Sequence, residues 1–89
     1  MSEAAADIFQ FPCVFPLKAM GYNTDEFEVL IVSIVRRHAP DLADHAVSSR
    51  LSSNGKYRSV TATFTAHSRE QLDALYTELS AHEQVLMLL

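Results

Sequence analysis

The chain has 89 residues, nearly half of them hydrophobic and a fifth charged, and this length supports one hydrophobic core and not two. Its formal net charge of −4 disfavours general nucleic-acid binding, because an acidic surface repels phosphate at long range. No apolar run approaches the roughly 20 residues that cross a bilayer, so we expect no membrane-spanning helix.

The first ten residues form an alanine-rich lead-in without a clear period, and we expect this segment to be flexible. Glu3 and Asp7 are acidic where a secretory signal would be basic, which argues against export. The single cysteine, Cys13, cannot form an internal disulfide and fits a reducing compartment. We therefore expect a cytoplasmic protein whose one domain covers residues 11–89.

The first strand is predicted directly after this lead-in. Pro12 and Pro16 exclude a helix, and because proline cannot donate to a ladder, the strand is expected to begin near Phe15. Side chains alternate along a strand, so Lys18 and Met20 should lie on the face opposite the core. The residues expected on the core side are Phe15, Leu17 and Ala19.

A helix is predicted next, after a break at Gly21–Thr24. Asn23 or Thr24 can cap it, and acidic residues in its first turn complement the helix dipole. Apolar residues then recur at three- and four-residue spacing, with Val29 and Val32 widening the stripe, until Pro40 ends the helix. The expected buried face consists of Phe27, Leu30, Ile31, Ile34, Val35 and His38.

After a loop over residues 41–45, the dipeptide Asn54-Gly55 predicts a hairpin. It is the strongest short-range hairpin signal, because both central residues of a type I′ turn need positive φ. The second strand of the hairpin alternates regularly between apolar and hydroxyl side chains. Val60, Ala62, Phe64 and Ala66 should face the helices, and Ser59, Thr61, Thr63 and Thr65 should face away.

A second helix and a last strand complete the chain. Ser68 with Gln71 three residues later is a capping box, and Leu72, Leu75, Tyr76 and Leu79 follow at helical spacing. Residues 84–89 are predicted to form the last strand. Two assignments of this strand stay open, with either Val85, Met87 and Leu89 or Leu86 and Leu88 facing the core, and both expose apolar groups.

The resulting order, β-α-β-β-α-β, predicts an α+β ferredoxin-like sandwich. Right-handed crossovers give a four-stranded antiparallel sheet with the second and fourth strands at its edges. Both helices cover one face, and the other face stays open. Because an exposed apolar strip at a sheet edge is a liability in a monomer, we expect a homodimer through the open face or an edge strand, or a partner protein that covers the strip.

Four segments carry a resemblance to a known family, and they lie in the family's order. They are Phe11-Pro12, residues 15–21, residues 35–40 and residues 52–60. In them the chain resembles the YbeD family of small bacterial proteins over about residues 11–89. The resemblance implies a ferredoxin-like fold close to ACT regulatory domains, which bind small molecules such as amino acids. It implies no catalytic residues, and the family is functionally uncharacterised.

ACT-type domains often hold a ligand in the turn between the first strand and the first helix, and this analogy gives a candidate ligand site. Here the turn contains Gly21, Tyr22, Asn23 and Thr24, and either Lys18 from the open face or a second subunit could complete it. Gly21 permits close backbone approach, and free amides at a helix start favour an anion. Asp25 works against an anion there. The alternative interpretation is a tight-turn glycine followed by an ordinary cap.

Metal binding and catalysis find little basis in the sequence. Cys13, His38, His45 and His67 fall toward one end of the predicted sheet, but no two of them have the close spacing typical of zinc ligands. Cys13 has no basic neighbour to activate it, and no nucleophile elbow or phosphate loop occurs. We therefore predict no metal, no cofactor and no enzymatic activity.

The sequence thus predicts a non-catalytic regulatory or adaptor domain that senses a small metabolite or binds a partner protein. The alternative is a single-stranded RNA-binding module, because RNA recognition motifs share this order of elements and stack bases on their open sheet face. Tyr57 is the one aromatic residue expected there in the third strand, with Lys56, Arg58 and Lys18 as phosphate partners. This set is thin for a nucleic-acid site.

Overall fold

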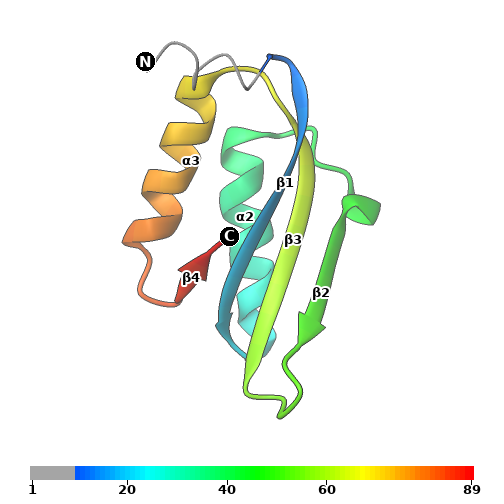
Figure 1. Ribbon diagram of the computed structural model, residues 1–89, viewed down its shortest axis with the longest axis vertical. Helices are drawn as coiled ribbons and strands as arrows, with labels where there is room; N and C mark the ends of the chain where they lie inside the picture. The colour runs from blue at the N-terminus through cyan, green and yellow to red at the C-terminus, as the bar shows by residue number, and fades with distance from the viewer. Residues whose placement is uncertain (1–9) are drawn as a thin grey trace.

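The computed structural model describes residues 10–89, so the predicted flexible lead-in lies almost entirely outside the described residues. Figure 1 shows the order of the elements. They are β1 (Cys13–Tyr22), α2 (Asp25–His38), the short 3-10 helix η1 (Asp44–Ala46), β2 (Val47–Leu51), β3 (Tyr57–Ala66), α3 (Arg69–Ala81) and β4 (Met87–Leu88). Within this part of the chain, no helix combines the length and apolarity needed to cross a membrane.

The four strands form one antiparallel sheet in the order β2-β3-β1-β4. The edges are β2 and β4, and the two long strands β1 and β3 pair along their whole length in the centre. In Figure 1, α2 lies behind β1 and β3, and α3 lies alongside α2. The predicted ferredoxin-like α+β fold is confirmed.

The core lies between the sheet and the two helices. Along β3, buried and half-exposed residues alternate as predicted, and the same alternation in β1 buries Leu17 and Ala19 while Lys18 stays exposed. The helices contribute one stripe each, in which Phe27 and Leu75 are almost completely buried. His38, expected on the buried stripe of α2, is half-buried, whereas Val29, expected to widen that stripe, is 69% exposed on the outer side of the helix.

The start of β1 differs from the prediction, because the strand begins at Cys13 and runs through Pro16. The carbonyls of Lys18 and Met20 accept hydrogen bonds from the β4 segment. Pro16 lies two residues before Lys18, so its ring nitrogen points to the same side of β1 as the Lys18 carbonyl. At that position the short β4 has already ended. No ladder bond is lost there, and the proline is therefore tolerated.

The hairpin between β2 and β3 forms, but its predicted type I′ turn is wrong. Among the described residues only Gly55 has a positive φ, of 73°, so Asn54 does not adopt the left-handed conformation that a type I′ turn requires. The Gly55 amide donates to the Ser52 carbonyl at 2.9 Å. The Asn54 side-chain oxygen accepts from the Lys56 amide at 3.0 Å, so the asparagine closes a longer loop with its side chain.

The last strand is shorter than predicted. Residues 84–89 were expected to be extended, but β4 contains only Met87 and Leu88. The Val85 amide donates to the His82 carbonyl at 3.0 Å, and this turn occupies the residues before the strand. In the register Met87 lies opposite Met20 and Leu88 opposite Ala19. Leu88 therefore packs on the core, and Met87 lies on the open face.

Gln71 joins the start of α3 to the end of α2. The predicted Ser68 cap is present, with the Gln71 amide donating to the Ser68 hydroxyl at 3.1 Å. The Gln71 side chain accepts from the His67 amide at 2.6 Å and donates to the His38 carbonyl at 2.8 Å. One side chain thus satisfies backbone groups at the ends of both helices, which otherwise lack intrahelical partners.

Candidate functional site

Gly21 lies in a tightly packed position at the end of β1. A Cβ atom added there would come within 2.4 Å of Phe27 Cε1 and 2.5 Å of the Gln84 carbonyl oxygen. Real Cβ atoms do not approach other atoms so closely, so only glycine fits at this position. The absence of a side chain at position 21 is thus explained by the Phe27 ring and the Gln84 backbone, and Gly21 itself is buried.

Asn23 is occupied by contacts within the protein. Its amide donates to the Lys56 carbonyl at 3.0 Å, and its side-chain nitrogen donates to the Gly55 carbonyl at 3.1 Å. Its side-chain oxygen accepts from Arg58 Nε at 3.2 Å. These bonds tie the turn before α2 to the β2–β3 hairpin, which is a structural role of Asn23.

Tyr22 and Thr24 lie on either side of Asn23. Thr24 is the N-cap of α2 by its extended backbone, but its side chain makes no capping hydrogen bond. Both residues line a hollow of about 140 Å³ whose other walls are Glu26 and Gln84. The first turn of α2 also contains Asp25 and Glu28. Three carboxylates at one helix start oppose the binding of an anionic ligand to its free amides.

Lys18 lies away from that turn, roughly 13 Å along β1 from Tyr22 at about 3.3 Å per residue. The structure therefore brings Tyr22, Asn23 and Thr24 together, but it places Lys18 in a different hollow. This second hollow has a volume of about 390 Å³ and lies on the open face of the sheet. We call it the open-face hollow; its lining residues are Lys18, Ser48, Ser49, Arg50, Ser59, Thr61 and Leu89.

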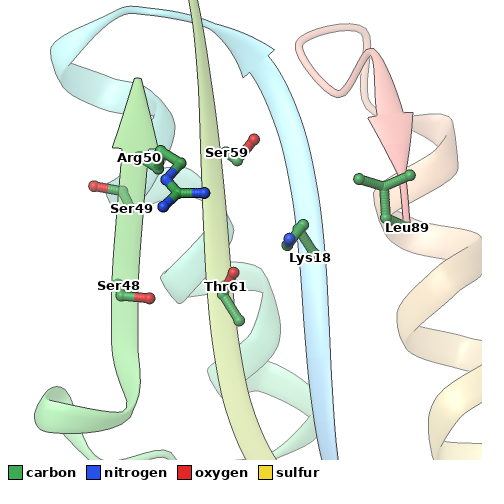
Figure 2. A pocket seen from close by; sticks show the side chains of 7 residues that line it. All are labelled: Lys18, Ser48, Ser49, Arg50, Ser59, Thr61 and Leu89. Atoms are coloured by element: carbon green, nitrogen blue, oxygen red, sulfur yellow. The ribbon is translucent and has the colours of Figure 1, made fainter. Parts of the chain in front are cut away.

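Figure 2 shows how these side chains lie. Arg50 on β2 extends its guanidinium group toward β3, and Lys18 on β1 approaches β3 from the other side. The register explains this arrangement, because Arg50 lies opposite Ser59 while Lys18 lies opposite Thr61. Ser49 points away from the hollow and donates to Glu28 Oε1 at 2.9 Å on the helix side.

The acidic side chains of the regular elements lie in the helices and not in the sheet. None of the four strands contains Asp or Glu, whereas α2 and α3 carry Asp25, Glu26, Glu28, Glu70, Asp73 and Glu78. The open face therefore presents cations in a protein of net charge −4. Within residues 10–89, the side chains of Lys18 and Arg50 form no ion pair with any carboxylate.

A second group of side chains lies at one end of the open face. The rings of Tyr22 and Tyr57 are stacked, with centroids 5.6 Å apart and an interplanar angle of 26°. Lys56 Nζ lies 5.4 Å from the centre of the Tyr57 ring. The sequence pointed to Tyr57 and Lys56 but missed the pairing with Tyr22, which depends on the register between β1 and β3.

The histidine and cysteine candidates remain apart. His38 Nε2 lies 2.7 Å from Glu78 Oε1, and Arg37 also pairs with Glu78, so this cluster joins α2 to α3. Cys13 is a free thiol, half-buried beside the core. Across residues 10–89, no three His, Cys, Asp or Glu side chains gather closely enough to hold a metal ion.

Arg50 was not among the site residues predicted from the sequence. Strand alternation placed Ser59 and Thr61 on the open face together with Lys18, but no residue of β2 was assigned to a site. The signal was available, because the hairpin fixes Arg50 opposite Ser59 and hence on that same face. The loop between β2 and β3 is longer than the predicted two-residue turn, but it leaves Arg50 paired with Ser59.

The sequence and the fold are similar to those of known proteins. Residues 6–89 match the family described as "Protein of unknown function (DUF493)". The UPF0250 protein of Chromobacterium violaceum is 49% identical over 89 residues, which is all of both chains. A UPF0250 protein of Neisseria gonorrhoeae is 43% identical over 84 residues, covering 94% of this chain and 92% of that one.

Among solved structures, protein HP0495 from H. pylori has a similar fold. Its solution structure matches with a TM-score of 0.67, covering 91% of this chain and 85% of that chain. The two sequences are 12% identical, so the likeness concerns the fold alone.

Proposed function

This chain belongs to the DUF493 family, which includes the UPF0250 proteins and to which the YbeD resemblance pointed, and we propose that it is a non-catalytic regulatory or adaptor domain that binds on the open face of its sheet. One observation carries this proposal. The open face combines cations without carboxylate partners among residues 10–89 with exposed apolar side chains of the C-terminal segment, namely Met87 and Leu89. Such a mixed surface is typical of a binding site.

The absence of catalysis is part of the same proposal. The half-buried His38 is held by Glu78 between the two helices, away from the open face. Tyr76 is the one described residue whose pKa is clearly shifted; burial raises it, and its ring packs edge-on against Phe15 at 6.2 Å. Tyr76 lines a hollow on α3 with Asp73, Thr77 and Ser80, but no histidine or lysine of the described chain that could activate these hydroxyls lines it. The lone cysteine agrees with action in the cytoplasm.

A matched pair of variants tests the binding surface. Met87→Glu places a carboxylate on the open face, whereas Val29→Glu places one on the outer side of α2, also at an exposed apolar position. The tagged chain is used to capture proteins from a native lysate, and the melting temperature is measured against a metabolite panel. We expect a saturable interaction that Met87→Glu weakens and Val29→Glu preserves, because only Met87→Glu changes the open face. A ligand that binds the folded state also raises its melting temperature.

The two readouts also separate an adaptor from a sensor. A sensor shows a rise in melting temperature with one class of metabolite, and an adaptor retains an identified protein and ignores the panel. Equal effects of Met87→Glu and Val29→Glu on every interaction would contradict the open face as the binding surface.

Single-stranded RNA is a second candidate partner, and the stacked pair of Tyr22 and Tyr57 beside Lys56 favours it. Aromatic rings on a sheet face stack on bases, and neighbouring cations contact phosphates. The expected result is a salt-dependent mobility shift of a short single-stranded RNA that Tyr57→Ala abolishes. A shift that survives this substitution, or no shift at low salt, removes this candidate.

A further inference from the structure

The open-face hollow contains the hydrogen-bonding groups that an oxyanion requires. Arg50 and Lys18 provide two cations from the strands on either side of β3. The hydroxyl groups of Ser59 and Thr61 lie on β3 between them, and Ser48 lies on β2 opposite Thr61. None of these three side chains has a hydrogen-bond partner among the described residues. Unused donors that converge on one concave surface are the usual mark of a ligand site.

The chemistry of these donors selects an anion. A guanidinium group offers a planar fork that matches the oxygens of a carboxylate or phosphate, and an ammonium group adds a compact charge. Hydroxyls can donate to the remaining oxygens. A cation or a neutral hydrocarbon would gain little from Arg50 and Lys18.

The rest of the molecule reinforces this selectivity. The carboxylates of α2 and α3 lie on the other side of the sheet, and no strand carries one. Glu28, the nearest helical carboxylate to β2 by its contacts, is engaged with Ser49 at 2.9 Å and lies 4.0 Å from Arg58 Nη1. An anion on the open face is therefore attracted by Arg50 and Lys18, and the sheet separates it from the acidic layer.

We propose that the open-face hollow binds the phosphate or carboxylate group of a small molecule, with Arg50 and Lys18 holding the charge and Ser48, Ser59 and Thr61 donating hydrogen bonds. The volume of about 390 Å³ suits a small metabolite. Leu89 forms one apolar wall, which favours a ligand with a short hydrocarbon part beside its charged group. This inference rests on the proposed function, since it names the ligand class of the same surface.

The proposal is tested by nuclear magnetic resonance titration of the full ¹⁵N-labelled chain with inorganic phosphate, with acetate as a second arm. Sodium chloride at matched ionic strength controls for screening. We expect saturable shifts in the amides of the residues that line the hollow. Whichever of phosphate and acetate has the lower dissociation constant shows whether the hollow prefers a phosphate or a carboxylate group.

Two variants make the titration specific. Loss of one charge-assisted contact in Arg50→Gln is expected to raise the dissociation constant about tenfold. Arg69→Gln removes the same charge on α3 and should leave it within about twofold. Shifts that sodium chloride reproduces, that spread over the whole surface, or that persist unchanged in Arg50→Gln would overturn the proposal.

The outcome is separable from that of the proposed function. If neither anion binds but Met87→Glu still weakens a saturable interaction, the anion site fails and the open-face binding domain stands. If an anion binds in the hollow but Met87→Glu and Val29→Glu have equal effects on all other partners, the adaptor role fails and the anion site stands.

Discussion

Gly21, predicted as a ligand-site residue, is also required by packing. Gly21→Ala would force a Cβ into the Phe27 ring and the Gln84 backbone, and the backbone atom cannot move aside cheaply. Overpacking of this kind costs about 1–3 kcal/mol, so we expect Gly21→Ala to lower the free energy of unfolding by about 2 kcal/mol or more. Urea denaturation followed by circular dichroism measures this loss.

The second glycine, Gly55, is the matched control. Its φ of 73° disfavours a side chain, but a Cβ there meets nothing within 4 Å. Gly55→Ala should therefore cost only about 1 kcal/mol, from backbone strain alone. A Gly21→Ala variant as stable as Gly55→Ala, or more stable, would show that Phe27 and Gln84 yield easily, and it would leave close ligand approach as the better reason for Gly21.

Tyr76 gives the protein a pH dependence at the alkaline end. Burial raises its pKa above the ordinary value of 10.0, so the folded state holds the phenol proton more tightly than the unfolded chain. The resulting contribution to stability is complete below the ordinary pKa and is lost as the pH rises through the folded value. We expect Tyr76→Phe to lose less stability than the parent between about pH 9 and pH 11. Equal losses of unfolding free energy in Tyr76→Phe and the parent, measured by urea titration across this pH range, would contradict the assignment of the pH dependence to Tyr76.

The residues of the candidate site were predictable to different degrees. Lys18 was placed on the open face because strand alternation is a local rule, and the structure puts it there. Arg50 was missed although the predicted hairpin places it opposite Ser59, because the alternation was followed along β3 and was not carried across the hairpin to β2. Asn23 or Thr24 was expected to cap the first helix; Thr24 takes that position, and the Asn23 side chain bonds to the hairpin more than 30 residues away along the chain.

At the scale of elements, the two helices depend on Gln71. Gln71→Ala removes the hydrogen bonds to the His67 amide and the His38 carbonyl and leaves those groups at the helix ends without this partner. We expect a loss of about 1–2 kcal/mol in the free energy of unfolding. Gln84→Ala, at an exposed position whose side chain makes no hydrogen bond within the described chain, should change stability by less than about 0.5 kcal/mol.

Thermal and urea unfolding measure the stability of Gln71→Ala and Gln84→Ala relative to the parent chain. A Gln71→Ala variant as stable as Gln84→Ala would mean that water replaces the side chain at no cost. The sequence predicted the cap, since Ser68 and Gln71 have the spacing of a capping box. It did not predict the bond to α2, which requires the two helices to be packed together first.

The elements themselves were predicted well where the hydrophobic pattern extended over many residues, and poorly where it covered only a few. α2 and α3 and the alternating β3 followed from hydrophobic spacing over ten or more residues. The prediction of the last strand was wrong in its length, because an apolar run of five residues fits either an extended segment or a turn followed by a short strand. The hydrogen bond from the Val85 amide to the His82 carbonyl selects the turn. The hairpin failed only in its turn type, because the Asn54 side chain offered another way to satisfy the backbone.

For the molecule as a whole, the cationic open face restricts how two copies can associate. Two open faces packed together would bring Lys18 and Arg50 of each copy toward the same groups of the other, which is unfavourable. The homodimer expected from the sequence should therefore form at the β4 edge, where Leu86, Met87 and Leu89 are exposed. We expect Leu86→Lys to raise the dimer dissociation constant at least about tenfold, because the buried charge would have no partner.

Sedimentation equilibrium over a range of concentrations measures this constant, and Val29→Lys on the outer side of α2 is the control. A parent chain that stays monomeric at high concentration, or a Leu86→Lys dimer as tight as that of the parent, would exclude assembly through this edge. Association that strengthens steeply with added salt would instead indicate that the two like-charged faces meet.

The position of Pro16 has a consequence for how this protein avoids polymerisation. β4 leaves the first half of β1 without a strand on that side among the described residues, and such a margin can template the growth of fibrils. The ring nitrogen of Pro16 points toward this margin and carries no hydrogen, so a stray strand from another molecule finds a gap in its ladder. We therefore expect Pro16, which the helix and strand patterns treat as an interruption, to disfavour amyloid-like stacking at this margin.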